Sequence, residues 1–375
     1  MWLVLAGLGA AVVIGGWLPL VDAVDIELTQ AGPILAFLIA TTVLAELSDA
    51  AGVFDVAAAA CARLARGSTA ALFGLVAVLS TVVTVVMGLD TTAVLLTPVV
   101  LAVTDAVGVA AIPFAMLVVW LANTASLLLP VSNLTNLLAV QHTGVSTIGF
   151  AGRMALPALA AVLITVAYLG LLFRRSLTGR YHAPPAAPPP DRLRFIVCTA
   201  ACGAFAVAVA CGVVPWVAAT AAAAAAAAPF AMRDRKRLRW SLIPWRPVVA
   251  VAGLLLVVGA LGAHGMAAVL SGWLGRSDAQ ATAVAAAMSN LVNNLPAYTA
   301  IRSAVPPGDQ GRSAAVLVGV NCGPLVTMWG SLATLLWAQR CRARGMTIAP
   351  LRFAAIGLGG VPLVLLGAGA ALHWS

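Results

Sequence analysis

Two related stretches of sequence define the architecture of this chain: ANTASLLLPVSNLTNLLAV at 122–140 and VNCGPLVTMWGSLATLLWA at 320–338. Aligning Asn123 with Asn321 pairs the two stretches at an offset of 198 residues. Each is an apolar run that polar residues and a proline interrupt. Freed backbone groups are tolerated at membrane depth only inside protein or beside a wet cavity, so each stretch predicts a broken helix at a polar site. The same offset also pairs Asn133 with Ser331, and Asn136 with Thr334.

A second pair of similar stretches precedes the first pair. MGLDTTAVLLTPV at 87–99 matches LVNNLPAYTAIRS at 291–303, which aligns Asp90 with Asn294 at an offset of 204 residues. The two offsets differ by only a loop-sized insertion. Because both matches occur in the same order, they predict an internal repeat. Many transporters are built from such repeats, and their solute site lies where the repeats meet.

The composition is that of an all-α, polytopic membrane protein. Of 375 residues, 62% are hydrophobic and 9% are charged, and the mean hydropathy is +1.04. Soluble domains carry about 25% charged residues. A spanning helix needs roughly 20 apolar residues, and the sequence offers about ten such stretches. The first, from Trp2 to Leu20, lacks a basic start and a convincing cleavage site. We interpret it as a retained span of a multi-pass plasma-membrane protein, not as a signal peptide.

A proline-rich segment at 177–194 divides the chain into a first transmembrane half at 1–176 and a second at 195–375. Prolines cannot continue a helix and favour an extended linker. Arginines flank the proline run on both sides, which predicts a cytoplasmic position. The net charge of +9 reflects such loop arginines. Because no soluble, aromatic-bearing basic module accompanies them, the sequence does not predict nucleic-acid binding.

Polar residues interrupt the apolar runs in four clusters, and together they form the candidate site for a solute or ion. The alternative is that their side chains join helices through hydrogen bonds. We favour a site because the clusters occupy repeat-related positions. The candidate residues are Asp90, Thr91, Thr92, Asn123, Ser132, Asn133, Thr135, Asn136, Asn290, Asn293, Asn294, Asn321, Cys322, Gly330, Ser331 and Thr334.

Asp90 is the candidate for proton coupling. A carboxylate inside a long apolar stretch is costly and is by default a functional residue. The alternative is that Asp90 caps the helix that follows it. The six cysteines show no CxxC pattern, and the sequence has no phosphate-binding loop and no HExxH or GxSxG motif. We therefore expect no metal, no cofactor and no enzymatic activity.

These clusters resemble those of the arsenical pump membrane proteins (the ArsB type), within the ion transporter superfamily. The most specific stretch is GSLATLLW at 330–337, followed by MTI at 346–348. SNLTNLLAV at 132–140, LDTTAVLLTPVVLAV at 89–103 and SNLVNNLPA at 289–297 also follow the family in order. The resemblance implies inverted repeats, each with a re-entrant hairpin and a broken helix. It further implies proton-driven export of arsenite and antimonite, with a separate cytoplasmic ATPase as a partner in some members.

The chain departs from this family at several site positions. Family members commonly carry an Asn-Asp pair where this chain has Leu89-Asp90, and they often carry Asp where it has Asn123 and Asn321. A Lys often follows the Gly-Pro pair, where this chain has Leu325. Losing two carboxylates and a lysine could change the coupling ion or the solute.

Two functional hypotheses follow. The first is a secondary active exporter of arsenite or antimonite, with Asp90 as the proton carrier. The alternative, motivated by Asn123 and Asn321, is a sodium- or proton-coupled transporter of another small ion or carboxylate in the same superfamily. A membrane anchor or a membrane enzyme is disfavoured, since neither needs repeat-related polar clusters. The expected partners are the solute, protons and the bilayer; an ATPase subunit and a second copy of the chain stay open.

Overall fold

The computed structural model describes residues 2–183 and 188–375, and helices make up nearly all of this part. An isolated bridge between Ser68 and Arg180 is its only extended pairing. Up to the linker, the helices are α1 (Trp2–Ile14), α2 (Leu20–Asp25), α3 (Gly32–Ala50), α4 (Val53–Leu64), α5 (Thr69–Met87), α6 (Leu89–Thr91), α7 (Thr97–Val107), α8 (Ala111–Thr124), α9 (Leu134–Thr143) and α10 (Thr147–Leu172). The π-helical η1 (Ile26–Ala31) and η2 (Thr92–Leu96) and the 3-10 turns η3 (Ala125–Leu127), η4 (Pro130–Ser132) and η5 (Arg174–Leu177) connect them.

The second part of the chain is built in the same way. Its helices are α11 (Arg192–Ala210), α12 (Pro215–Arg233), α13 (Trp245–Ala263), α14 (Met266–Leu274), α15 (Asp278–Val292), α16 (Asn294–Arg302), α17 (Gln310–Cys322), α18 (Leu332–Ala343) and α19 (Pro350–Ala371). Its 3-10 turns are η6 (Arg235–Arg237), η7 (Trp240–Leu242) and η8 (Leu372–Trp374).

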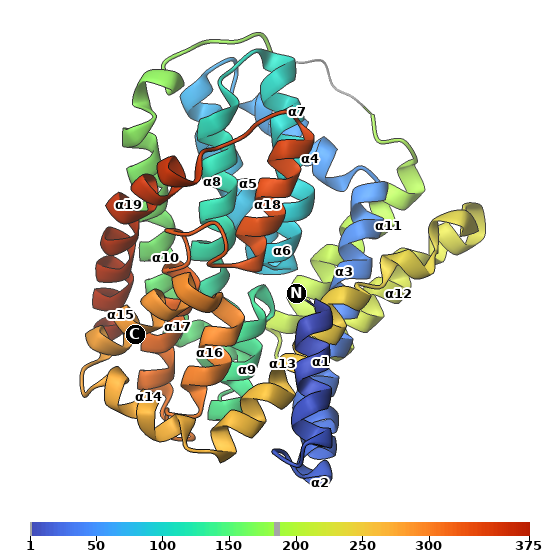
Figure 1. Cartoon of the computed structure of the whole chain (residues 1–375). Helices are drawn as coiled ribbons and strands as arrows, with labels where there is room; N and C mark the ends of the chain where they lie inside the picture. The colour runs from blue at the N-terminus through green and yellow to red at the C-terminus, as the bar shows by residue number, and fades with distance from the viewer. Residues whose placement is uncertain (1, 184–187) are drawn as a thin grey trace.

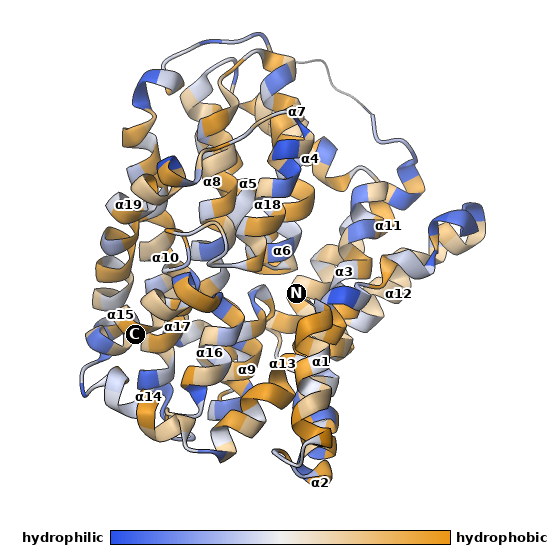
Figure 2. Ribbon diagram, viewed as in Figure 1, coloured by the Kyte–Doolittle hydropathy of each residue, from blue (hydrophilic) through white to orange (hydrophobic). Residues whose placement is uncertain are grey.

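Eight helices in the described ranges are long and apolar enough to cross a membrane. Two shorter apolar helices, at Trp2–Ile14 and Ala111–Leu127, bring the total to the ten segments that the sequence predicts. Hydrophilic residues gather in the loops and at the ends of the helices (Figure 2). This distribution, with the helix lengths, confirms a polytopic α-helical membrane fold.

Both predicted broken helices are present, and they run in opposite directions. The break between α8 and α9 contains Pro130, and α9 begins at the N-cap Asn133. The break between α17 and α18 contains Pro324, and α18 begins at the N-cap Ser331. Asn133 and Ser331 are therefore equivalent at the predicted offset of 198. In Figure 1, α8 lies above α9 whereas α17 lies below α18, so the two units are inverted.

Two helical hairpins precede the broken helices. The first turns at Gly88 between α5 and α6, and the second turns at Asn293 between α15 and α16. Gly88 has φ 89° and ψ 164°, and Asn293 has φ 87° and ψ 152°. The backbone thus pairs Gly88 with Asn293, which is one residue away from the sequence alignment of Asp90 with Asn294. The alignment followed similar side chains, whereas the position of the turn depends on the backbone angles.

Among the remaining long helices, α1, α3, α11, α12 and α13 form a second group at the right of Figure 1, whereas α10 and α19 pack on each other at its left. α1 crosses α13 closely, because Gly9 and Gly253 lie at the crossing and a Cβ on either would meet the backbone of the other helix. α12 packs on α3 through small alanines, among them the buried Ala222 and Ala226. Residues 184–187 of the predicted linker, including Pro184 and Pro185, lie outside the described residues.

Candidate solute-binding site

A cavity of about 340 Å³ lies between the two hairpin turns and the second group of helices. Its polar lining comes from Asp90, Asn133, Asn293 and Asn294, all of them predicted site residues. The rest of its wall is apolar. That wall consists of Leu5, Leu38, Leu89, Leu134, Pro247, Ala250, Val251, Leu254, Val292, Leu295, Pro296 and Leu332.

Four helices begin at this cavity, which explains why residues so distant in sequence meet there. α6, α9, α16 and α18 start at Leu89, Leu134, Asn294 and Leu332, and each of these first residues lines the cavity. The N-terminus of a helix carries unpaired amide groups and a partial positive charge. Four such ends create a polar environment at a depth where side chains alone would supply little polarity.

Asp90 lies in the first turn of α6, and its position argues against a capping role. Gly88 is the N-cap residue, and no side chain caps this helix. Asp90 Oδ1 is buried without a hydrogen-bond partner among the described residues, and Asp90 forms no ion pair with any of them. The ionised form of a carboxylate without a partner is destabilised in a mostly apolar wall. Asp90 therefore favours binding a proton or a hydrogen-bond donor.

Asn321 connects the two repeat units behind the cavity. Its Oδ1 accepts hydrogen bonds from Asn133 Nδ2 at 2.9 Å and from Thr135 Oγ1 at 2.9 Å. Its Nδ2 donates to Asn136 Oδ1 at 2.8 Å. Asn136 Nδ2 in turn donates to the carbonyls of Ser126 and Leu129 in the first break. This buried network fixes Asn133 at the cavity wall.

Hydrogen bonds also hold each hairpin against the break of its own unit. Ser132 Oγ donates to the Val85 carbonyl of α5 at 2.9 Å. In the other unit, Asn290 Oδ1 accepts from the amides of Val326 and Thr327 at 3.2 and 2.9 Å. Asn293 Nδ2 donates to the Trp329 carbonyl at 2.9 Å. The predicted polar residues therefore include both a cavity lining and the braces that position it.

Asn294 differs from its neighbours in the lining. Its backbone amide donates to the Gly330 carbonyl at 2.8 Å. Within residues 2–183 and 188–375, no hydrogen bond engages its side-chain amide. Asn294 is only 4% exposed and lines the cavity. Its side chain is thus free to bind a solute.

Several predicted site residues lie away from the cavity. Thr92 bonds Thr84 inside the first hairpin, and Asn123 donates to the Val119 carbonyl of its own helix. Cys322 is completely buried in α17 and is absent from the cavity lining. Thr91, Gly330, Ser331 and Thr334 are also absent from that lining, and Ser331 and Thr334 bond each other at 2.9 Å.

The apolar wall from α1, α3 and α13 was not predicted from the sequence. Leu5, Leu38 and Val251 are ordinary apolar residues within apolar helices. Lipid tails are as apolar as a protein interior. A sequence therefore carries no signal that separates a cavity-facing leucine from a lipid-facing one.

No arginine, lysine or histidine lines the cavity in the part of the chain that the structure describes, and Asp90 is its single titratable residue. The lining therefore carries at most one negative charge. Such a site suits an uncharged solute with hydroxyl groups, which amides and a carboxylate can bind by hydrogen bonds.

Inverted hairpins and broken helices around a central cavity define a membrane transporter. The model of the citrate transporter family (CitMHS) matches residues 1–319. Arsenical pump membrane proteins of Escherichia coli and Yersinia enterocolitica are 29% and 30% identical over 342 and 345 residues. Each alignment covers 84% of this chain, with 79% and 80% of the two relatives. The chain therefore belongs to the citrate transporter family of the ion transporter superfamily, and it is a relative of these arsenical pump membrane proteins.

A solved structure supports the same fold. The YdaH transporter of Alcanivorax borkumensis, described as having an unusual topology, matches with a TM-score of 0.58. The match covers 95% of this chain and 89% of that chain at 15% identity. The family model and the arsenical pump relatives, with the eight candidate spans, confirm the family resemblance and the multi-pass location in the plasma membrane, both predicted from the sequence. Within the described residues, no group of three or more His, Cys, Asp or Glu could hold a metal ion.

Proposed function

We propose that this transporter exports arsenite or antimonite from the cytoplasm in exchange for protons. The observation that carries the proposal is the cavity with Asp90 as its single titratable residue and amides as its other polar groups. Arsenous acid is a small, neutral, hydroxylated solute. The amides of Asn133 and Asn294 can bind its hydroxyls, and an ionised Asp90 can accept a hydrogen bond from one of them.

The same geometry gives a reason for exchange. A proton would neutralise the unpaired Asp90 carboxylate, and a solute hydroxyl would donate a hydrogen bond to it. They therefore compete for it, so a proton arriving from outside favours release of the solute. Competition for one group is the simplest basis for antiport, and it requires no second carboxylate at Asn123 or Asn321.

A second candidate is export or import of a small carboxylate, which the name of the matching family model favours. The electrostatics of the cavity argue against it. A citrate-like anion would meet the Asp90 carboxylate and no cationic side chain in the described part of the chain. The helix N-termini supply partial positive charges that attract an anion, but an ionised Asp90 carboxylate in the same lining would repel it.

The orientation and the partners complete the proposal. We place the 177–194 linker and the arginine-rich loops in the cytoplasm, because positively charged loops are retained there. The two transmembrane halves at 1–176 and 195–375 are proposed as the repeat units that this linker joins. Association with a cytoplasmic ATPase stays a prediction of the family resemblance, and association with a second copy of the chain stays open. The lack of enzymatic activity stays a prediction from the missing catalytic motifs.

The test is arsenite uptake into everted membrane vesicles with an imposed proton gradient. Wild-type protein is expected to accumulate arsenite, and the accumulation should stop when the gradient is collapsed. Asp90→Asn should abolish gradient-driven accumulation, because it removes the group that takes up the proton. Asp105→Asn is the matched control, since Asp105 is exposed at the end of α7, the helix that continues the same hairpin.

Three outcomes would count against the proposal. Accumulation by Asp90→Asn at the wild-type level would remove Asp90 from coupling. Arsenite uptake driven by a sodium gradient alone would show that sodium, and not the proton, is the coupling ion. Citrate uptake without arsenite uptake would establish the carboxylate alternative.

A further inference from the structure

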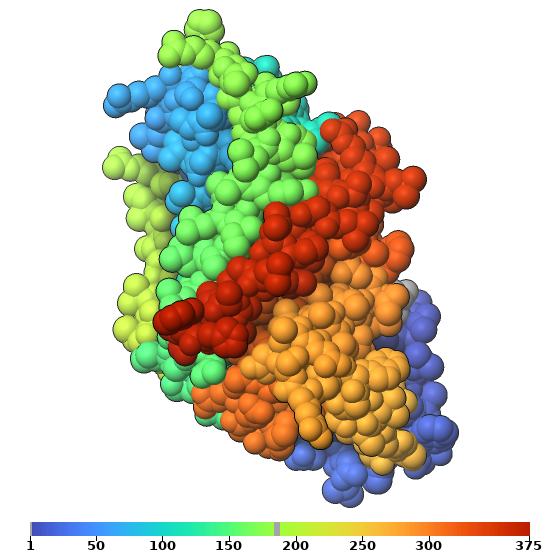
Figure 3. Space-filling model, turned by 90° about the vertical axis from the view of Figure 1, so that its left-hand side faces the viewer, coloured from blue at the N-terminus to red at the C-terminus, as the bar shows by residue number. Residues whose placement is uncertain are grey.

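A second cavity lies at the end of the molecule that we place in the cytoplasm, and it shares no lining residue with the solute site. It has a volume of about 600 Å³ and lies between the end of α10 and the beginning of α19. Figure 3 shows these two helices side by side on one face of the molecule, α10 in green and α19 in red. The hydrogen bond from Tyr168 Oη of α10 to the Ile356 carbonyl at 2.8 Å joins them just below the cavity.

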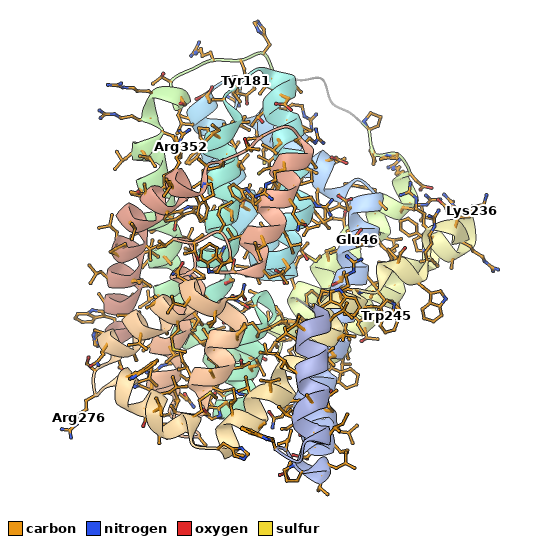
Figure 4. All side chains as sticks on the ribbon, in the orientation of Figure 1. Glu46, Tyr181, Lys236, Trp245, Arg276 and Arg352 are labelled. Atoms are coloured by element: carbon orange, nitrogen blue, oxygen red, sulfur yellow. The ribbon has the colours of Figure 1, made fainter. Side chains whose placement is uncertain are left out.

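Three arginines line this cavity: Arg174, Arg175 and Arg352. All three side chains are exposed, and none forms an ion pair within the described ranges. No carboxylate of the described residues lines the cavity. Figure 4 labels Arg352 at the beginning of α19, beside the upper end of α10. The cavity is therefore strongly positive, and the N-terminus of α19 adds the partial positive charge of a helix end.

The neighbouring wall is apolar, and part of it is exposed on the molecular surface. Leu171 and Leu172 line the cavity and are 70% and 47% exposed, and Ile356 and Phe173 complete the wall. An anionic phospholipid can use both parts of this lining: its headgroup phosphate can pair with the arginines, and its acyl chain can pack on the exposed leucines. A soluble anion would use the arginines alone. Basic pockets between transmembrane helices are a known way to bind anionic lipid headgroups.

We propose that Arg174, Arg175 and Arg352 bind the headgroup phosphate of an anionic phospholipid, whose acyl chain lies along Leu171 and Leu172. The lipid would join α10 to α19, the last helices of the two repeat units. This site is independent of the transported solute, so it stands or falls separately from the proposed function.

The proposal is tested by native mass spectrometry of the purified chain titrated with dioleoylphosphatidylglycerol or dioleoylphosphatidylcholine. Each basic residue near a membrane contributes about 1 kcal/mol to anionic lipid binding. We therefore expect the wild type, with three such arginines, to prefer phosphatidylglycerol by roughly 100-fold. The combined R174Q, R175Q and R352Q variant should bind the two lipids equally. Combined R235Q, K236Q and R237Q removes as much charge from η6, which lines none of the described cavities, and should keep the preference.

Further measurements separate the sources of the anion and guard against misfolding. Inorganic phosphate at millimolar concentration should not abolish the preference for phosphatidylglycerol. If it does, the site binds a soluble anion and the lipid proposal is wrong. The proposal also fails if the Arg174/Arg175/Arg352 variant keeps the preference, or if the η6 variant loses it equally. If the triple variant misfolds, the R352Q single variant replaces it, because Arg352 is exposed and its loss should not disturb folding. R352Q should reduce the preference for phosphatidylglycerol by about fivefold.

Discussion

Replacing Asn321 by alanine should destabilise the protein far more than replacing Asn123, although the two residues are repeat-related and both completely buried. Asn321 makes three side-chain hydrogen bonds to the other repeat unit, with Asn133, Thr135 and Asn136. Asn123 donates one hydrogen bond to its own helix, and its Oδ1 is without a partner among the described residues. The two substitutions remove the same atoms, so the difference between them isolates the bridging bonds.

The magnitude follows from the number of bonds. Side-chain hydrogen bonds in membrane proteins contribute about 0.6 kcal/mol on average and up to about 1.7. Three of them make the free energy of unfolding of Asn321→Ala about 2 to 5 kcal/mol lower than that of the wild type. Asn123→Ala removes one hydrogen bond and one unsatisfied oxygen. Apart from the cost of the lost side-chain volume, it should change the free energy of unfolding by less than about 1 kcal/mol.

The assay is unfolding in mixed micelles with increasing sodium dodecyl sulfate, followed by the fluorescence of the 10 tryptophans. Asn321→Asp keeps both accepted bonds but sets a buried carboxylate oxygen against Asn136 Oδ1, so it should also destabilise the protein, and less at low pH, where the carboxyl group is protonated and can donate. Equal destabilisation by Asn123→Ala and Asn321→Ala would refute the claim that Asn321 joins the two units.

Two further predictions concern glycines at close approaches. Gly88→Ala should lower the free energy of unfolding by about 1 to 3 kcal/mol, because residues other than glycine rarely adopt φ 89° and ψ 164°. Gly152→Ala, in a helix with no atom within 4 Å of an added Cβ, should be neutral or slightly stabilising in the same sodium dodecyl sulfate titration. Gly253→Ala should cost about 1 to 3 kcal/mol and reduce transport, because the new Cβ meets the Leu5 backbone and displaces α1 from the cavity wall. Gly262→Ala, on the same helix with open space around it, is the control; a loss of transport there would show that α13 tolerates no substitution at all.

The turn at Asn293 combines a backbone conformation typical of glycine with a polar side chain in the cavity lining. Asn293 holds φ 87° and ψ 152°, which glycine adopts readily and other residues rarely do. Its Nδ2 bond to the Trp329 carbonyl and its N-cap bond from the Leu295 amide at 3.4 Å compensate for part of that strain. An asparagine at this turn therefore supplies both the turn and the polar groups that glycine would lack.

The sequence by itself determined the class of the protein, and it predicted the polar residues that line the cavity, Asp90, Asn133, Asn293 and Asn294. Low charge and long apolar runs leave only a membrane fold, because lipid removes the need for a polar surface. The prolines and capping residues of the two broken helices set their boundaries locally, so Asn133 and Ser331 were paired correctly from the sequence. Asp90 was identified because a carboxylate in an apolar run is rare and costly.

The tertiary structure decided what no local signal contains. The register of the hairpin turn depends on backbone angles at Gly88 and Asn293, and the alignment of similar side chains missed it by one residue. The bonds from Asn321 to the other unit join residues more than 180 positions apart. Which leucines line the cavity and which face lipid is decided by packing alone, since both environments are equally apolar. The separation of the cavity lining from its braces likewise exists only in three dimensions.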